Sequence, residues 1–172
     1  MLAIKINDVK GFMNRLLIGD TFDAFPVAEA EITTFNTFSI DGQINKDFFD
    51  TDVQETLAQE HRDYSLWKDL KAYCYSIIRG KRTPLQFKII FQIAPEQAAA
   101  ALNLSGSTTQ EQPENARVVR AFFLNVQYRN RTLQCTTGVS LSAFLLDKGP
   151  EQQWDASVLD FFKKQKVDFE LL

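Results

Sequence analysis

Apolar residues recur along the chain with two different spacings, and the first of these predicts strands. In the stretch 85–93 every second residue is apolar, which is typical of a strand with one buried face. The stretches 118–128 and 133–141 alternate in the same way on either side of Asn130, so we expect them to form a long hairpin.

Three further regions favour extended structure. Residues 21–44 are rich in Thr, Phe and Ile and predict two strands plus a short third, with a hairpin turn at Asp41-Gly42. A short strand is expected at 2–6, and the segment 167–172 is expected to add an edge strand.

The second spacing is helical. Apolar residues repeat every three or four positions over 9–17 and over 65–79, and a third stripe follows Gly149-Pro150. Pro95 is expected to begin a short helix, and the acidic stretch 46–63 is expected to form one or two helical turns.

The order of these elements predicts the fold class. Adjacent strands outnumber strand–helix–strand alternations, so we expect an α+β fold with a mainly antiparallel sheet and helices packed on one side. The 172 residues are expected to form a single domain, 1–172. Within it, the polar stretch 103–115 is expected to be a mobile loop, because it cannot bury enough apolar surface to offset the entropy of ordering.

Composition adds a core rich in aromatic side chains. The chain has 45% hydrophobic residues and 15 phenylalanines, which predicts an aromatic core or an apolar groove. The N-terminus lacks the apolar segment of a secretory signal, and no stretch approaches the length of a membrane span. We therefore expect a cytoplasmic protein without a membrane partner.

Charge is unevenly distributed, although the formal net charge is only −3. Residues 41–63 carry seven acids and two bases, whereas 79–95 carry four bases and no acid, and 115–146 carry four arginines and no acid. A negative net charge argues against tight binding of nucleic acid, which usually requires a strongly basic domain.

The two basic stretches supply the candidate binding residues. If the fold brings them together, they would bind an anionic ligand or a partner protein. A simpler explanation exists for the basic residues around Gly80: they would hydrogen-bond the last carbonyls of the preceding helix and would not bind a ligand. The candidate residues are Lys81, Arg82, Arg117, Arg120, Arg129 and Arg131.

Catalytic and metal motifs are weak. His61 is the only histidine and lies in a charged, exposed-looking stretch. The aspartates of 41–52 do not follow the spacing of a calcium loop, and no phosphate-binding glycine loop occurs, so neither a metal nor a cofactor is expected. Cys74 and Cys135 lack zinc-site spacing and are expected to be small buried hydrophobes.

Residues 20–25 together with 33–42 are similar to one recurring pattern of an uncharacterised bacterial family, and residues 80–85 are similar to another. The family that the chain resembles is a domain of unknown function from anaerobic Gram-positive bacteria. The resemblance covers most of the chain. It implies no activity, ligand or catalytic residue.

These observations favour a non-catalytic binding or accessory module that recognises a protein or an anionic ligand. One alternative is a nucleic-acid-binding protein that uses a basic sheet face, with arginines beside stacking aromatic residues. Another is an enzyme built on Asp20, Asp23, Asn36 and Asp41, which lie near predicted strand ends. The sequence leaves the oligomeric state open.

Overall fold

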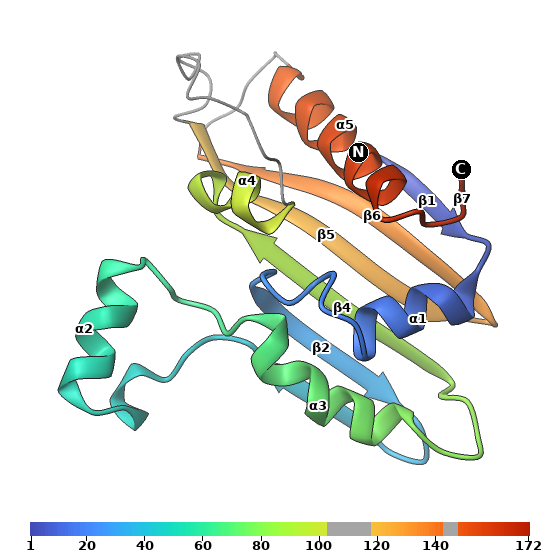
Figure 1. Ribbon diagram of the computed structural model, residues 1–172, viewed down its shortest axis with the longest axis horizontal. Coiled ribbons are helices and arrows are strands. Elements are labelled where there is room, and N and C mark those ends of the chain that lie inside the picture. Colours follow the sequence, from blue (N-terminus) through green and yellow to red (C-terminus); the bar gives the residue numbers. More distant parts are fainter. Residues whose placement is uncertain (103–117, 143–147) are drawn as a thin grey trace.

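A computed structural model describes residues 1–102, 118–142 and 148–172 (Figure 1). The expected loop at 103–115 lies outside these residues. The described chain contains one seven-stranded antiparallel sheet with the strand order β3-β2-β4-β5-β6-β1-β7. The strands are β1 (Ala3–Ile6), β2 (Val27–Thr33), β3 (Thr37–Asp41), β4 (Gln86–Ile93), β5 (Val119–Arg129), β6 (Thr132–Leu141) and β7 (Phe169–Leu171).

Helices cover one face of this sheet, so the predicted α+β class is confirmed. Figure 1 shows α1, α3, α4 and α5 in front of the strands, whereas α2 stands to one side. The helices are α1 (Val9–Leu17), α2 (Thr51–Gln59), α3 (Trp67–Ile78), α4 (Ala98–Ala101) and α5 (Gly149–Lys164), with short 3₁₀ turns η1 (Lys46–Phe48) and η2 (Pro95–Gln97). No helix in the described part of the chain, including the 16-residue α5, has the length and apolar character needed to cross a bilayer.

The alternating pattern of 85–93 explains why the sheet has two different faces. In β4, Phe87, Ile89, Phe91 and Ile93 are buried beneath the helices, and the residues between them are partly exposed on the opposite face. β4 pairs with β5, and β5 pairs with β6. The predicted strand at 85–93 and the predicted hairpin at 118–141 therefore lie side by side in one sheet.

Aromatic rings fill the space between the sheet and the helices. Phe22 is fully buried and stacks on Phe91 of β4 with a centroid distance of 5.8 Å. Its ring also lies 5.5 Å from that of Phe12 in α1 and 5.8 Å from that of Phe161 in α5. The surplus of phenylalanine therefore serves mainly the core, where each ring removes a large apolar area from water.

One predicted turn is wrong. β2 and β3 are joined by residues 34–36, whereas Asp41-Gly42 ends β3 and leads out of the sheet. Gly42 is needed there for a different reason. A Cβ atom at this position would lie only 1.7 Å from the carbonyl oxygen of Val27, so the backbone approaches β2 too closely for any side chain.

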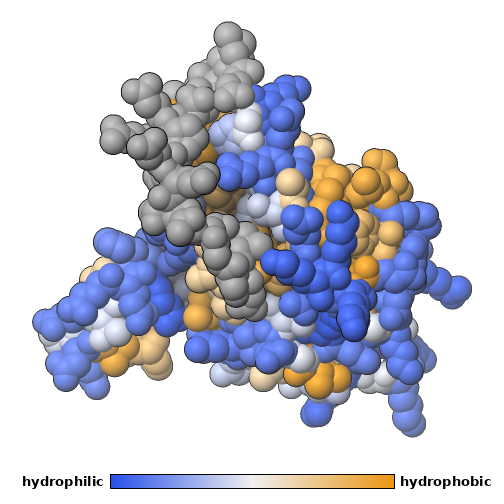
Figure 2. All heavy atoms as spheres, turned by 45° about the horizontal axis from the view of Figure 1, so that its top comes forward, coloured by the Kyte–Doolittle hydropathy of each residue, from blue (hydrophilic) through white to orange (hydrophobic). Residues whose placement is uncertain are grey.

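After Gly42 the chain leaves the body as an arm, defined here as residues 43–65. Its two sides are joined by a bridge between Gln43 and Tyr64 and by a 2.8 Å hydrogen bond from the Ile44 amide to the Asp63 carbonyl. The arm carries η1 and α2, and it projects at the left of Figures 1 and 2.

Candidate functional site

Three connections meet at one end of the sheet. They are the β2–β3 turn at 34–36, the α3–β4 loop at 79–85 and the β5–β6 turn at 130–131. Thr33 is the register partner of Gln86, and Gln86 is the partner of Arg129, so the three connections lie side by side. Five basic residues belong to or border them, and we call these residues the basic end: Arg79, Lys81, Arg82, Arg129 and Arg131.

The basic end is not neutralised by the rest of the described chain. Its three connections contain no acidic residue. Within the described ranges, Lys81, Arg82, Arg129 and Arg131 are exposed and have no ion pair or side-chain hydrogen bond. The Arg79 guanidinium lies 5.9 Å from the centre of the Tyr75 ring. Lys81 and Arg82 therefore do not hydrogen-bond the last carbonyls of α3, which was the simpler explanation of this stretch.

Apolar side chains accompany these charges. Phe35 in the β2–β3 turn is 86% exposed, and Leu85 in the α3–β4 loop is 70% exposed. The two loops are joined by a 2.9 Å hydrogen bond from the Leu85 amide to the Thr33 carbonyl. This end of the molecule thus presents positive charge and apolar surface together, a combination that suits a protein partner.

The β5–β6 turn carries backbone strain. Asn130 and Arg131 have φ angles of 52° and 62°, as the two central residues of a type I′ hairpin turn require. Asparagine tolerates this left-handed conformation, but arginine adopts it at a cost of about 1–2 kcal/mol, and glycine is the usual residue at the second position. Strain of this kind is concentrated at functional sites, so the strained backbone of Arg131 suggests a binding role for its side chain.

The structure separates the six candidate basic residues. Lys81, Arg82, Arg129 and Arg131 lie at the basic end, whereas Arg120 lies near the start of β5. The two ends of β5 are far apart because nine residue steps of extended chain span roughly 30 Å. Arg117 lies outside the described residues. Phe35 and Leu85 were not predicted from the sequence as binding residues. The alternation over 85–93 predicts Leu85 on the buried face of the strand, but this residue precedes β4 and is exposed.

Arg120 instead borders a small cavity at the base of the arm. The cavity has a volume of about 160 Å³, which is below the several hundred Å³ of most ligand pockets. Its polar lining includes His61, Arg62, Tyr64, Gln92, Gln97 and Arg120.

The charge of Arg62 in this cavity is already largely balanced. Its Nη1 atom lies 3.6 Å from Glu60 and its Nη2 atom lies 3.4 Å from Asp69, whereas its buried Nε atom has no partner. Because the cavity is small and the charge of Arg62 is balanced by two carboxylates, it is a weaker candidate for binding an anion than the basic end.

The four residues of the proposed enzyme do not form a site. Asp23 is paired with Lys71 at 2.6 Å, and Asp20 is exposed at the end of α1. Asn36 and Asp41 are exposed at opposite ends of β3. In the described ranges, no three His, Cys, Asp or Glu side chains gather as metal ligands would.

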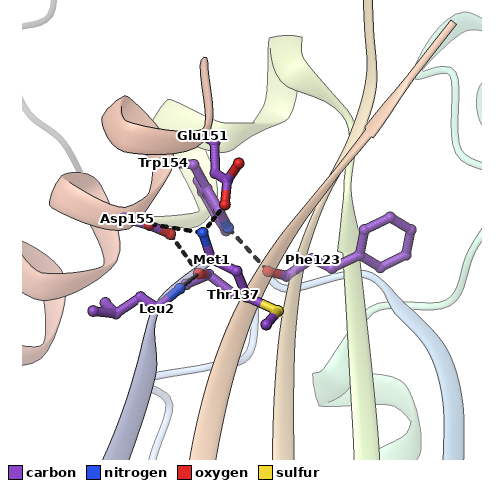
Figure 3. Close-up of polar contacts among 7 residues, drawn as sticks. All are labelled: Met1, Leu2, Phe123, Thr137, Glu151, Trp154 and Asp155. Atoms are coloured by element: carbon purple, nitrogen blue, oxygen red, sulfur yellow. Dashed lines mark hydrogen bonds and ion pairs between the residues drawn. The ribbon is translucent and has the colours of Figure 1, made fainter. Parts of the chain in front are cut away.

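A second polar cluster ties β1 to α5 (Figure 3). The buried Thr137 hydroxyl accepts a 2.8 Å hydrogen bond from the Leu2 amide and donates to the Asp155 carboxylate. The Met1 amino group lies 3.3 Å from Asp155 and also pairs with Glu151. Because both sides of the Thr137 hydroxyl are engaged, this cluster holds secondary structure together and offers no free reactive group.

The uncovered sheet face carries mixed charges. Lys5 pairs with Glu170 at 2.6 Å, and Lys88 pairs with Glu29 at 3.4 Å. Within the described ranges, the charged residues of this face without an ion pair include Arg129, at the edge shared with the basic end, and Glu31 in β2. Arg129 therefore adds positive charge from this face to the basic end.

Both cysteines are buried in the core, as expected. Removal from water raises the pKa of the Cys74 thiol to about 11 and raises the pKa of the Cys135 thiol further. Neither thiol has the open, electropositive surroundings that a reactive cysteine needs.

Comparison with protein families finds a match to a family of unknown function. Residues 15–170 match a family described as "Family of unknown function (DUF5721)". No curated protein matches the chain. No solved structure matches it either.

Proposed function

The chain belongs to the DUF5721 family, whose function is unknown, and from this premise we propose that it is a non-catalytic module whose basic end binds an acidic, partly apolar segment of a partner protein. The proposal keeps two expectations from the sequence: a cytoplasmic location and an origin in anaerobic Gram-positive bacteria.

One observation supports the proposal above all others. Four exposed cations without ion pairs in the described chain lie with two exposed apolar side chains at one end of the sheet, where β2, β4 and β5 pair side by side. Loops on a rigid sheet are common carriers of binding residues. Arginine and aromatic residues are also enriched at protein interfaces, whereas lysine, glutamate and aspartate are depleted there.

The partner chemistry follows from the same residues. Phosphate or nucleic acid needs the cations but gains little from Leu85, which is 70% exposed. A protein segment with acidic and apolar side chains uses both features. Arg131 is a charged residue at a strained turn position, and we expect it to contact a carboxylate of that segment.

A peptide-binding experiment tests the proposal. The probe is a labelled glutamate-rich peptide that contains two phenylalanines, and its affinity is measured by fluorescence anisotropy. We expect Arg82→Glu/Arg131→Glu to weaken binding by about tenfold or more, and raised salt to weaken binding to the native protein. Lys68→Glu/Lys148→Glu is the matched control, because it changes the net charge equally at positions outside the basic end and should bind like the native protein.

Two results would overturn the proposal. The first is equal loss of peptide binding in the Lys68→Glu/Lys148→Glu control, which would show that only net charge matters. The second is tighter binding of a labelled single-stranded oligonucleotide than of the peptide, with loss through Arg82→Glu/Arg131→Glu. That second result would favour nucleic acid as the partner.

A further inference from the structure

The helix of the arm, α2, makes little contact with the rest of the described chain. Figure 1 shows α2 standing apart from the sheet and from the other helices. Of its nine residues only Leu57 is buried, and Leu57 does not belong to the main core. A helix this short is not stable in water without packing, so α2 needs a surface to dock on.

The arm also exposes an apolar patch. Phe48 is 84% exposed, Val53 is 42% exposed and Phe49 is 38% exposed. The rings of Phe48 and Phe49 lie edge to face at 5.3 Å, and the Gln54 side chain holds the Phe49 carbonyl at 2.7 Å. Figure 2 shows apolar surface gathered on the lower side of the projecting arm. An ordered patch of aromatic side chains on a projecting element is typical of an interaction site.

Unpaired acids surround this patch. In the arm, Lys46 is paired with Asp63 at 2.8 Å. Within the described residues, four acidic side chains close to the patch have no ion pair with a basic residue: Asp47, Asp50, Asp52 and Glu55. Seven of the 22 acids and two of the 19 bases lie in 41–63, so this segment carries −5 while the rest of the chain carries +2.

We propose that the arm of one copy of this chain docks on the basic end of a second copy. The two surfaces are complementary in charge and alike in apolar character. Acids around Phe48 would meet unpaired cations around Phe35 and Leu85. This inference rests on the proposed function and names a second copy of the chain as the partner protein.

Geometry places this contact between copies. The arm joins the body just before Trp67, at the start of α3, and the basic end begins just after Ile78, at its other end. The 12 residues of α3 hold these points roughly 18 Å apart at the helical rise per residue, and the arm points away from the body. Two different surfaces at opposite ends give a head-to-tail contact, which produces a ring or an open chain of copies.

Two variants that each disable one surface test this arrangement. Phe48→Ser/Val53→Ser removes the apolar patch from the arm, and Arg82→Glu/Arg131→Glu reverses charge at the basic end. All four side chains are substantially exposed, so both proteins should fold, which circular dichroism and thermal melting would verify.

Analytical ultracentrifugation at low salt then measures assembly. We expect the native protein to form species larger than a monomer, with a mass that rises with concentration and falls with added salt. Each variant alone should be monomeric. An equimolar mixture should give a complex of two chains and nothing larger, because the intact arm of one variant docks on the intact basic end of the other and no complementary pair of surfaces remains.

Three results would overturn the inference. Assembly that persists in Arg82→Glu/Arg131→Glu would show an arm-to-arm contact instead. A mixture that stays monomeric would show that the two surfaces do not meet. A native protein that remains monomeric at all concentrations would also exclude self-docking. In the last two cases, peptide binding at the basic end decides whether the proposed function survives, because it does not depend on a second copy.

Discussion

Phe22 and Phe48 are the same residue type in one short chain, yet their surroundings are opposite. Phe22 is fully buried, and its ring lies within 6 Å of four other phenylalanine rings, those of Phe12, Phe25, Phe91 and Phe161. Phe48 is 84% exposed, and its one ring contact in the described chain is with its neighbour Phe49.

This contrast extends to the two regions that contain these residues. In the body, polar groups find partners: the Trp67 indole reaches a carbonyl, and the Thr137 hydroxyl reaches both an amide and a carboxylate. In the arm and at the basic end, by contrast, several exposed charged side chains have no ion pair inside the described chain: Asp47, Asp50, Asp52, Glu55, Lys81, Arg82, Arg129 and Arg131. The body is thus built for stability, and the two surfaces at its ends are available for recognition.

The largest difference between the regions is expected in stability. Phe22→Ala should lower the free energy of unfolding by about 3–5 kcal/mol, because it leaves a cavity amid four rings. Phe48→Ala should change it by no more than about 0.5 kcal/mol in monomeric protein at high salt. Urea unfolding of both variants checks this. Equal losses would place the arm inside the cooperative core and contradict the comparison.

A smaller effect is expected where the arm joins the body. The buried indole N–H of Trp67, the first residue of α3, donates a 2.5 Å hydrogen bond to the carbonyl of Leu16 at the end of α1. Trp67→Phe keeps an aromatic ring but leaves that carbonyl unpaired, so unfolding should require about 1–3 kcal/mol less. Tyr73→Phe on the same helix is the control, since Tyr73 is 66% exposed and should show no change. A loss from both variants would indicate a general effect on α3.

The sequence predicted the body better than its ends. Strands β4, β5 and β6 were recognisable because their apolar residues alternate and their buried face is continuous. The β2–β3 turn was misplaced because Asp-Gly is a good hairpin pair locally, whereas the close approach of Gly42 to Val27 is a tertiary requirement.

The candidate site was only partly predictable for the same reason. A run of like charges in sequence does not stay together when a long strand separates its members, so Arg120 and Arg129 lie at opposite ends of β5. The exposure of Phe35 and Leu85 depends on which side of the fold each loop occupies. Periodicity predicts burial within strands and helices, but it does not apply to loops.

The sealed interior of the body predicts a particular response to pH. Burial raises the pKa of the Cys74 thiol from 9.0 to about 11, so the folded protein holds this proton at pH values where the unfolded chain releases it. The associated stability is complete below about pH 9 and is lost as pH rises toward 11, by at most about 1.4 kcal/mol for each pH unit.

Unfolding measurements from pH 8.5 to 11 on native protein and Cys74→Ala check this, with the loss expected to be steeper in the native protein. A thiol reagent should label neither cysteine until the protein unfolds. Rapid labelling of the folded protein would show that the body is less tightly closed than the comparison assumes.

The smallest expected change separates stability from recognition within a single turn. Arg131→Gly removes a left-handed arginine with a φ angle of 62° and should raise the free energy of unfolding by up to about 1 kcal/mol. The same substitution removes a cation from the basic end and should weaken binding of the acidic peptide. Asn130→Gly is the matched control: it relaxes the same turn, gains less stability because asparagine tolerates this conformation, and should bind the peptide as the native protein does. If Arg131→Gly instead lowered the melting temperature, or left peptide binding unchanged, the strain at residue 131 would have no link to function. The basic end would then be an ordinary hairpin edge.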